Sequence, residues 1–420
     1  MAHFVTQRWE GDPGAMGGRR ARALFSFQAF VPDPIADFQL MVSFEAANAV
    51  ARAEEAIRTL NEHAGVIGLE AVGPLLLRSE AVASSRLENI DVSTFNLARA
   101  LIDPRHARGA AREVAANVAA METAIAIGEK EADLTIEDLA EIHRILMAES
   151  TRPQQAGHVR TVQNWIGGRL NNPSDAVYIP PPAGEVVRLL DDLVAFLNRA
   201  DLPAIAQAAI AHAQFETIHP FEDGNGRTGR CLIHLILRRR GLTPHFVPPI
   251  SIVLAARPTS YVAGLTGFRE GKAVEWCLSF AAAAGRAAET SLALANRVAE
   301  LQAEWRARAG HPRAGSAAAR TIDYLPAQPI LSAGTIRAAI GSSHQRASDG
   351  LARLAESGVL RQIGGGTYDR TYAADELFTL VEAYERLAAH PDDDGARILI
   401  LAEDPGLEGV RLPGRDRETG

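Results

Sequence analysis

Residues Ile218–Arg240 read IHPFEDGNGRTGRCLIHLILRRR, and the interpretation of the whole chain starts from this stretch. Pro220 disfavours helix at the residue before it, so His219 should lie in a loop. The letters DGNG are typical of a turn, and the apolar run that follows them predicts a helix. The stretch therefore predicts a glycine-rich loop that leads into a helix N-terminus.

Such a loop favours a bound anion, typically a phosphate, because the first backbone N–H groups of a helix are unpaired. Arg227 and Arg230 are three residues apart and should project from one face towards that anion. Asp223 offers a hard oxygen ligand for Mg²⁺, and His219 can accept a proton near neutral pH. The glycines are not followed by Gly-Lys-Ser/Thr, which excludes a Walker-type P-loop. Base, acid, glycines and arginines so close together indicate a phosphate-handling site rather than a surface turn.

Helical periodicity recurs on both sides of this stretch. The apolar spacing predicts helices over Phe38–Asn61, Leu75–Leu87 and Val186–Asn198. Asn89 is placed to end the second of these in a left-handed conformation. Residues 160–182 are an exception, because the runs TVQNWI and AVYI lean towards strands and are separated by Gly, Asn and Pro. We interpret them as a β-hairpin or flap in a mostly α-helical chain.

A different pattern begins after a polar linker near Arg308–Gly315. Three short helices are predicted, over Ala317–Leu325, Ala333–Ile340 and His344–Glu356, followed by a small β-wing in LRQIGGGTYDRTY. This order predicts a winged helix-turn-helix. Between residues 316 and 386 there are seven Arg, no Lys and eight Asp or Glu. A domain that reads DNA usually carries a positive face, so we favour a protein-contact or dimerisation role.

Chain length, net charge and cysteine content further restrict the kind of protein that the sequence can encode. A chain of 420 residues predicts two or three compact units, and the net charge of −8 gives no general reason to expect nucleic-acid binding. Neither a signal peptide nor a membrane span is apparent, and Cys231 and Cys277 are expected to be buried thiols in a cytoplasmic protein. The expected organisation is a loose leader over 1–29, an N-terminal helical domain over 30–109, a catalytic core over 110–305, a winged helix over 310–390 and an uninterpreted tail over 391–420.

The segment 219–230 matches HxFx[DE]GNGRxxR at every specified position, and this pattern resembles that of the Fic family. The resemblance extends to QNWIGG…YIPPP, to PTSYVAGL and to RSEAVASSRLEN, and it covers roughly residues 30–285. It implies a Fic-type helical core with a β-hairpin flap and an N-terminal helical extension. A C-terminal winged helix is a common companion in the family.

The resemblance implies a protein adenylyltransferase that uses ATP and Mg²⁺ to place AMP on a Ser, Thr or Tyr hydroxyl of an unknown target protein. His219 would be the base and Asp223 would hold Mg²⁺. Tyr261 either packs near the nucleoside or belongs to the core. The flap would align the target by pairing with its extended backbone. The nucleotide-binding residues implied are Gly224, Asn225, Gly226, Arg227, Arg230 and Tyr261.

Ser84–Asn89, SSRLEN, matches the pattern [ST]xxxE[GN] of self-inhibited Fic proteins. Ser84 and Glu88 are i and i+4, so both could point from one helical face at a neighbouring site. In the family this Glu pairs with the second motif arginine, which here is Arg230. The resemblance therefore implies that Glu88 inhibits the enzyme.

Several alternatives stay open. Fic relatives with Lys in place of Gly226 act as kinases, and Gly226 argues for AMP transfer. Some members remove AMP from a modified protein in the same pocket. A DNA-binding regulator with a nucleotide-sensing Fic domain is a third reading. A homodimer is left open, whereas DNA and membrane partners are not expected.

Overall fold

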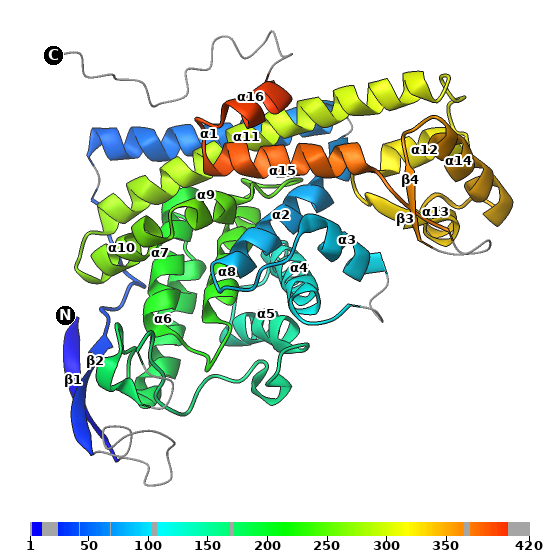
Figure 1. Ribbon diagram of the computed structural model, residues 1–420. Coiled ribbons are helices and arrows are strands. Elements are labelled where there is room, and N and C mark those ends of the chain that lie inside the picture. Colours follow the sequence, from blue (N-terminus) through cyan, green and yellow to red (C-terminus); the bar gives the residue numbers. More distant parts are fainter. Residues whose placement is uncertain are drawn as a thin grey trace. The chain divides into compact units, whose positions relative to one another are not determined.

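The computed structural model describes residues 2–10, 24–41, 43–67, 69–102, 107–168, 172–364 and 370–401. It divides into two units, Met1–Glu289 and Thr290–Gly420, and each is described by itself (Figure 1). The boundary falls inside the continuous helix α11, Ala273–Arg308, rather than after residue 305 as the sequence predicted. In α11, Trp276 donates to the carbonyl of Ala209 in the first unit, whereas Trp305 donates to Glu376 in the second.

The first unit is a helical assembly around α7, in which every residue is buried. Helix α7 is rich in alanine, so neighbouring helices can approach its backbone closely, and it packs against α8, α6, α1 and α10. Helix α8 packs in turn against α4, α5 and α2. The helices of this unit are α1 Phe44–Ile67, α2 Gly73–Arg86, α3 Thr94–Ile102, α4 Ala110–Gly128, α5 Ile136–Met147, α6 Val186–Leu197, α7 Ala204–Ile218, α8 Asn225–Arg239, α9 Ile250–Ala256 and α10 Pro258–Arg269.

The helices predicted from periodicity are present, with shifted ends. The first begins at Phe44 rather than Phe38, while α2 and α6 lie within two residues of their predicted bounds. Asn89 has a φ of 61°, which is the left-handed conformation expected for a stop after α2. Cys231 and Cys277 are buried and free, as predicted.

The prediction of a loose leader over residues 1–29 is wrong. Strands β1 His3–Trp9 and β2 Phe25–Val31 pair antiparallel, from His3 opposite Val31 to Trp9 opposite Phe25. FSFQAFV alternates in exposure with period two, as a half-buried strand does. The prediction failed because Gly- and Arg-rich residues separate the two strands, and those connecting residues 11–23 lie outside the described part of the chain.

The flap is built with little regular strand. Ile166 and Tyr178 form one antiparallel bridge, and the backbone N–H of Phe30 in β2 donates to the carbonyl of Ile179 at 2.9 Å. The flap and the N-terminal hairpin are therefore joined through backbone hydrogen bonding. Three short 3₁₀ segments flank or interrupt the flap, Pro153–Gln155, Pro173–Asp175 and Ala183–Glu185.

The second unit contains the elements expected after the linker. Ser316, Ser332 and Ser343 each cap a helix, because each hydroxyl accepts from the backbone N–H three residues on. Strands are ordered β3-β5-β4 in an antiparallel sheet. The elements are α12 Ala317–Tyr324, β3 Ile330–Ser332, α13 Ala333–Ile340, α14 His344–Glu356, β4 Arg361–Gly364, β5 Thr371–Ala373, α15 Asp375–Ala389 and α16 Asp394–Leu401.

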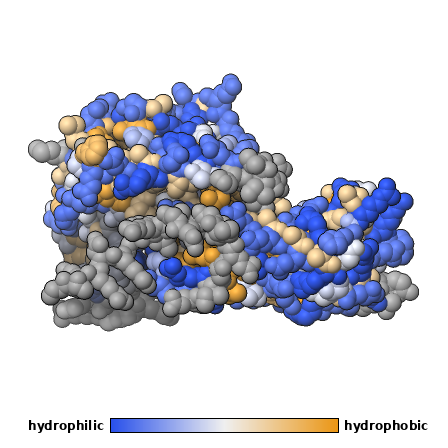
Figure 2. Space-filling view, turned by 90° about the horizontal axis from the view of Figure 1, so that it is seen from above, coloured by the Kyte–Doolittle hydropathy of each residue, from blue (hydrophilic) through white to orange (hydrophobic). Residues whose placement is uncertain are grey.

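Within the described residues, every helix is too short or too polar to cross a lipid bilayer. Figure 2 shows one face of the molecule, on which hydrophilic residues predominate and hydrophobic residues occur in small groups.

Candidate active site

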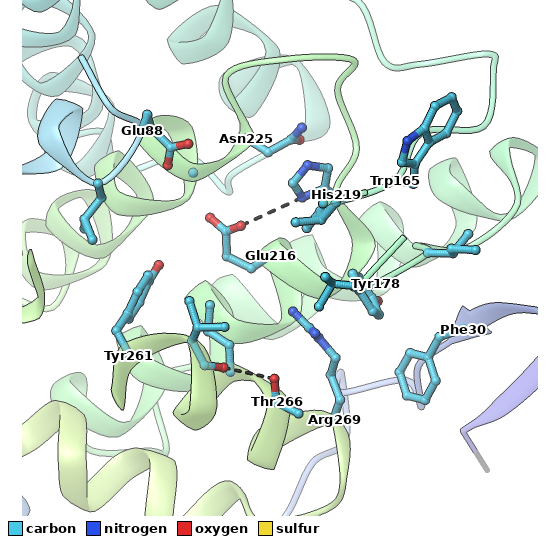
Figure 3. A pocket seen from close by; sticks show the side chains of 18 of the residues that line it. Phe30, Glu88, Trp165, Tyr178, Glu216, His219, Asn225, Tyr261, Thr266 and Arg269 are labelled. Carbon is cyan, nitrogen blue, oxygen red and sulfur yellow. Dashed lines mark hydrogen bonds and ion pairs between the residues drawn. The ribbon is translucent and has the colours of Figure 1, made fainter. Parts of the chain in front are cut away.

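A cavity of about 850 Å³ opens where α7 ends and α8 begins. Its walls come from the turn after α2, the flap, α10 and the N-terminal hairpin (Figure 3). This volume is within the range that binds small organic ligands. His219, Asp223, Gly226, Arg230 and Tyr261, all predicted as site residues, line it.

His219 caps the C-terminus of α7 in a left-handed conformation, with φ 51° and ψ 61°. A left-handed backbone is uncommon for a residue other than glycine, and such strain persists where the surroundings fix it. Burial, reinforced by the positive charge of Arg160, lowers the pKa of His219 to about 4. The imidazole is therefore neutral near neutral pH and available as a proton acceptor.

Two flap residues fix the backbone of His219. Arg160 is 2% exposed and donates to the carbonyls of His219, Val162 and Pro181 at 2.9, 3.0 and 2.6 Å. Asn164 donates to the carbonyl of Phe221 at 2.8 Å and to that of His219 at 3.3 Å. Arg160 thus joins the loop that begins at His219 to both ends of the flap through hydrogen bonds to backbone carbonyls.

The other side of the loop rests on His143. Its ring stacks on Phe221 with centroids 3.7 Å apart and an interplanar angle of 4°. The N–H of Gly157 donates to its Nδ1, so the proton is on Nε2, which donates to the carbonyl of Asp223 at 3.0 Å. The Asn225 side chain bonds the backbone N–H and C=O of Phe221, both at 2.8 Å. Asn225 thus shapes the loop with its side chain and can offer the predicted cradle its backbone N–H.

The N-terminus of α8 is prepared for an anion. Its N-cap is Gly224, with φ 74°, and no side chain of the described residues caps it. The unpaired N–H groups of the first turn therefore remain available to a ligand. A Cβ on Gly226 would lie 1.9 Å from Oε1 of Glu88. The carboxylate of Glu88 is thus already in contact with the first turn of α8, and Gly226 is the residue that allows it.

Arg230 is held by the two residues predicted to be inhibitory. Its side chain is 1% exposed, and it donates through Nη2 to Glu88 Oε1 at 2.8 Å and through Nε to Ser84 Oγ at 2.8 Å. Burial opposes ionisation of Glu88, but Arg230 outweighs it and lowers the pKa of that carboxyl. Glu88 lies in the turn after α2 rather than on the helix itself, yet the predicted meeting with Arg230 is present.

Arg227 does not follow its predicted direction. It is buried and does not line the cavity, and its Nη2 approaches Met147 Sδ at 3.9 Å while Nη1 lies 3.9 Å from Glu113. Arg227 in the first turn of α8 and Arg230 in the second diverge, because Arg230 reaches Ser84 of α2, whereas Arg227 reaches α4 and α5. The expectation that both arginines face one anion is therefore not met.

Two further predicted site residues line the cavity, the buried Tyr261 and the exposed Asp223. The Tyr261 hydroxyl is 2.8 Å from His212 Nε2, and the residue is buried while still lining the cavity. Both alternatives for Tyr261, core and pocket, describe part of its position. Asp223 is exposed and accepts from the N–H of Gly224 at 2.7 Å.

Four residues of this site were missed from the sequence: His143, Arg160, Asn164 and Glu216. All four lie outside the short motif. The fold brings His143, Arg160 and Asn164 to the loop that begins at His219, whereas Glu216 is only three residues before His219 in the sequence. Arg160 and Asn164 had one available signal, because both belong to the segment interpreted as a flap.

Comparison with known proteins agrees with this geometry. Residues 133–237 match the Fic/DOC family, and residues 45–126 match the Fic/DOC family N-terminal region. These two stretches of the chain are therefore similar to the Fic/DOC domain and to the N-terminal region of that family.

Individual relatives are similar over the same part of the chain. It is 35% identical over 119 residues to protein adenylyltransferase fic-1 of Caenorhabditis elegans and to protein adenylyltransferase Fic of Drosophila melanogaster. Each match covers 28% of this chain and 22% of the relative, so the chain spans about a fifth of the length of these relatives. A crystal structure of a Fic family protein from Desulfovibrio desulfuricans G20 has a TM-score of 0.50 at 24% identity, covering 80% of this chain and 97% of that one. The fold is thus of the Fic type.

Proposed function

We propose that this protein is an adenylyltransferase that moves AMP from ATP to a hydroxyl side chain of another protein. One observation carries the proposal: a neutral, half-buried histidine and an uncapped helix N-terminus face the same cavity of about 850 Å³. A base beside a phosphate site is the combination that nucleotidyl transfer requires. The names of the relatives, protein adenylyltransferases, support the same reaction class.

The proposed chemistry uses the residues as follows. The first turn of α8 binds the phosphates through the backbone N–H groups of Asn225 and Gly226, and the N–H of Gly224 joins them when it leaves Asp223. His219 takes the proton of the target hydroxyl, whose oxygen bonds to the α-phosphorus. The bond from that phosphorus to the bridging oxygen breaks, and its electron pair leaves with pyrophosphate. Arg230 binds an outer phosphate, and Tyr261 borders the nucleoside.

Asp223 is suited to Mg²⁺. Its carboxylate is exposed at the cavity beside the phosphate site, and among the described residues no cluster of three His, Cys, Asp or Glu forms a complete metal cage. Mg²⁺ in nucleotide sites is usually held by one or two carboxylates together with substrate phosphates, so this donor set fits. Bound there, the ion would neutralise charge on the phosphates.

Glu88 acts as the inhibitor in this proposal. Its carboxylate occupies the anion site of α8 and pairs with Arg230, which removes the cationic partner of the outer phosphate. ATP can then bind with its α-phosphorus turned away from the target hydroxyl. Glu88 also lines the cavity near His219, and this position favours AMP removal, assisted by Glu88, as the second candidate function.

The experiment compares two radiolabelled forms of ATP in the Glu88→Gly protein incubated with cell lysate. Transfer of AMP places α-label on protein and leaves γ-label in solution. Label from the γ-position on protein would indicate a kinase instead. If the unsubstituted protein instead removes AMP from a modified target protein, and neither form of labelled ATP labels protein, the removal reaction is favoured.

A further inference from the structure

We propose that Glu216 is a positioning residue for His219, whose carboxylate orients the imidazole and offsets the positive charge formed on it during transfer. This inference rests on the proposed function, because it assigns Glu216 a part in the same reaction. Nothing in the sequence motif points to Glu216, which precedes the motif by three residues.

The two side chains face each other inside the cavity wall. Glu216 lies in the last turn of α7, and its Oε2 is 3.8 Å from Nδ1 of His219 (Figure 3). Among the described residues, Nδ1 of His219 and Oε1 of Glu216 are buried without a hydrogen-bond partner. Each group can therefore satisfy the other by a small rotation, and contacts of this kind often tighten when substrate binds.

The chain leaves space for this carboxylate. A Cβ on Gly229 would lie 2.8 Å from Oε1 of Glu216, closer than side-chain carbons approach an oxygen. Gly229 is inside α8, where glycine costs about 1 kcal/mol relative to alanine. The glycine in the Arg-Thr-Gly-Arg part of the motif is thus explained by the position of Glu216.

The surrounding charges show why His219 needs a carboxylate. Arg160 from the flap and Arg269 from α10 oppose a proton on His219, while Glu88 and the backbone carbonyl of Glu216 favour it. Burial dominates and disfavours the imidazolium. An anion held against Nδ1 offsets this cost, as the carboxylate of a catalytic triad does for its histidine.

The carboxylate itself titrates near neutral pH. Burial, opposed by Arg230 and Arg269 and reinforced by Glu88, raises the pKa of Glu216 to about 7. Tyr261 and His212 face Glu216 from α10 and α7, and both are neutral there, because burial raises the pKa of the phenol and lowers that of the imidazole to about 3. Glu216 is therefore the group whose charge changes in the working range.

The proposed transfer moves one proton to His219 and the AMP group to the target. The target O–H bond breaks and its proton goes to Nε2 of His219, while the oxygen bonds to the α-phosphorus and pyrophosphate leaves with the electron pair of the broken P–O bond. Nδ1–H points at the ionised carboxylate of Glu216, which keeps its negative charge throughout. The proton on Nε2 is then released to solvent or to pyrophosphate.

The test measures the single-turnover rate of α-label transfer against pH in the Glu88→Gly protein, with and without Glu216→Gln. Glu216 must be ionised, so the rate of the Glu88→Gly protein should rise with pH, with a midpoint below about 7 because this variant lacks the Glu88 charge that raises the pKa of Glu216. Glu216→Gln keeps the size and the backbone carbonyl but removes the charge. It should lower the rate at about pH 8 by at least about tenfold, with ATP affinity unchanged, and leave a pH-independent rate.

Two further variants separate the outcomes. Glu216→Asp restores a carboxylate and should recover part of the rate and the dependence on pH, whereas Glu129→Gln, an exposed acid paired with Arg238, should change neither. An unchanged rate in Glu216→Gln would overturn the inference. If that variant fails to fold, a pH-independent rate between about pH 5 and about pH 8 in the Glu88→Gly protein would overturn it as well. Absence of α-label in every protein would instead contradict the proposed function.

Discussion

Gly226, which has no Cβ, lies where the predicted inhibitor Glu88 meets the predicted phosphate site. Glu88 Oε1 lies where a side chain on Gly226 would have to be. In the proposed mechanism the carboxylate and the phosphates of ATP would therefore compete for one place at the start of α8, and Arg230 would pair with either anion. The relation between the short patterns at 84–89 and 219–230 is thus a contact between atoms.

Replacing Glu88 by Gly should raise α-label transfer by at least about tenfold. A charge-assisted hydrogen bond is worth roughly 1.5–3 kcal/mol, and each 1.4 kcal/mol corresponds to about a factor of ten. The measurement is label incorporated at equal protein concentration. Asp91→Ala is the matched control, because Asp91 is an exposed acid in the same turn that pairs with Arg86 at 3.3 Å. Equal activity of Glu88→Gly and the unsubstituted protein would refute self-inhibition.

At the scale of single elements, the flap holds the backbone of the loop at His219, in addition to its predicted contact with the target. Through Arg160 and Asn164 it bonds the backbone of the catalytic loop, and His219 keeps its left-handed conformation between α7 and Pro220. A flap that only covered the cavity would not need a buried guanidinium at its base. Stability and catalysis are therefore coupled at this element.

Arg160→Met should weaken both properties. The variant keeps the apolar volume but leaves buried carbonyls without donors, which costs roughly 1–3 kcal/mol each. We expect the free energy of unfolding to fall by at least about 2 kcal/mol and α-label transfer to fall with it. Denaturant titration and labelling in the Glu88→Gly background measure the two effects. Arg188→Met, which removes an exposed pair with Glu185, should change neither measurably.

Helix α2 is a fixed part of the first unit rather than a detachable lid. Glu80 is fully buried, accepts from Ser251 Oγ and from the backbone N–H of Ser251 at 2.5 and 2.8 Å, and lies 2.9 Å from His234 of α8. Asn117 of α4 donates to Ser85 and to the carbonyl of Ala81. In the proposed mechanism, relief of inhibition would therefore come from the turn that carries Glu88.

Removal of the Glu80 carboxylate tests this anchoring. Glu80→Ala breaks a buried polar cluster and should lower the free energy of unfolding by about 3–5 kcal/mol. Glu55→Ala is the control, because its side chain is 72% exposed and surface changes usually stay within about 0.5 kcal/mol. Thermal or denaturant unfolding gives both values. A loss at Glu80 no larger than that at Glu55 would mean that α2 is free to detach.

At the scale of the whole molecule, short sequence patterns predicted the turns, helices and helix ends that depend on neighbouring residues in the chain. The loop from His219 to Gly224, the helix after it and the left-handed Asn89 follow from Pro, Gly and apolar spacing along the chain. The hairpin of β1 and β2 did not, because its strands pair across an intervening segment. Arg160 reaches the loop at His219 through the packing of the flap, which single-sequence spacing does not encode, and Glu216 is only three residues before His219 but belongs to no motif that marks it.

The second unit is expected not to bind DNA tightly. We propose that it is a winged helix, in which α14 would be the helix that reads the major groove. Arg346 is exposed on α14, but Arg353 donates to the carbonyl of Ala309 at 2.6 Å, and Asp349 adds a negative charge.

Binding to DNA depends on several cationic contacts with phosphates, so we expect no dissociation constant tighter than about micromolar at physiological salt, the range of non-specific binding. Fluorescence anisotropy with a mixed-sequence duplex at two salt concentrations measures this. As a matched pair, Asp349→Arg should tighten binding by adding a phosphate contact, whereas Gln345→Ala should not. A salt-sensitive nanomolar complex with one sequence would revive the reading of the chain as a DNA-binding regulator, because non-specific contacts with the phosphate backbone alone do not reach that affinity.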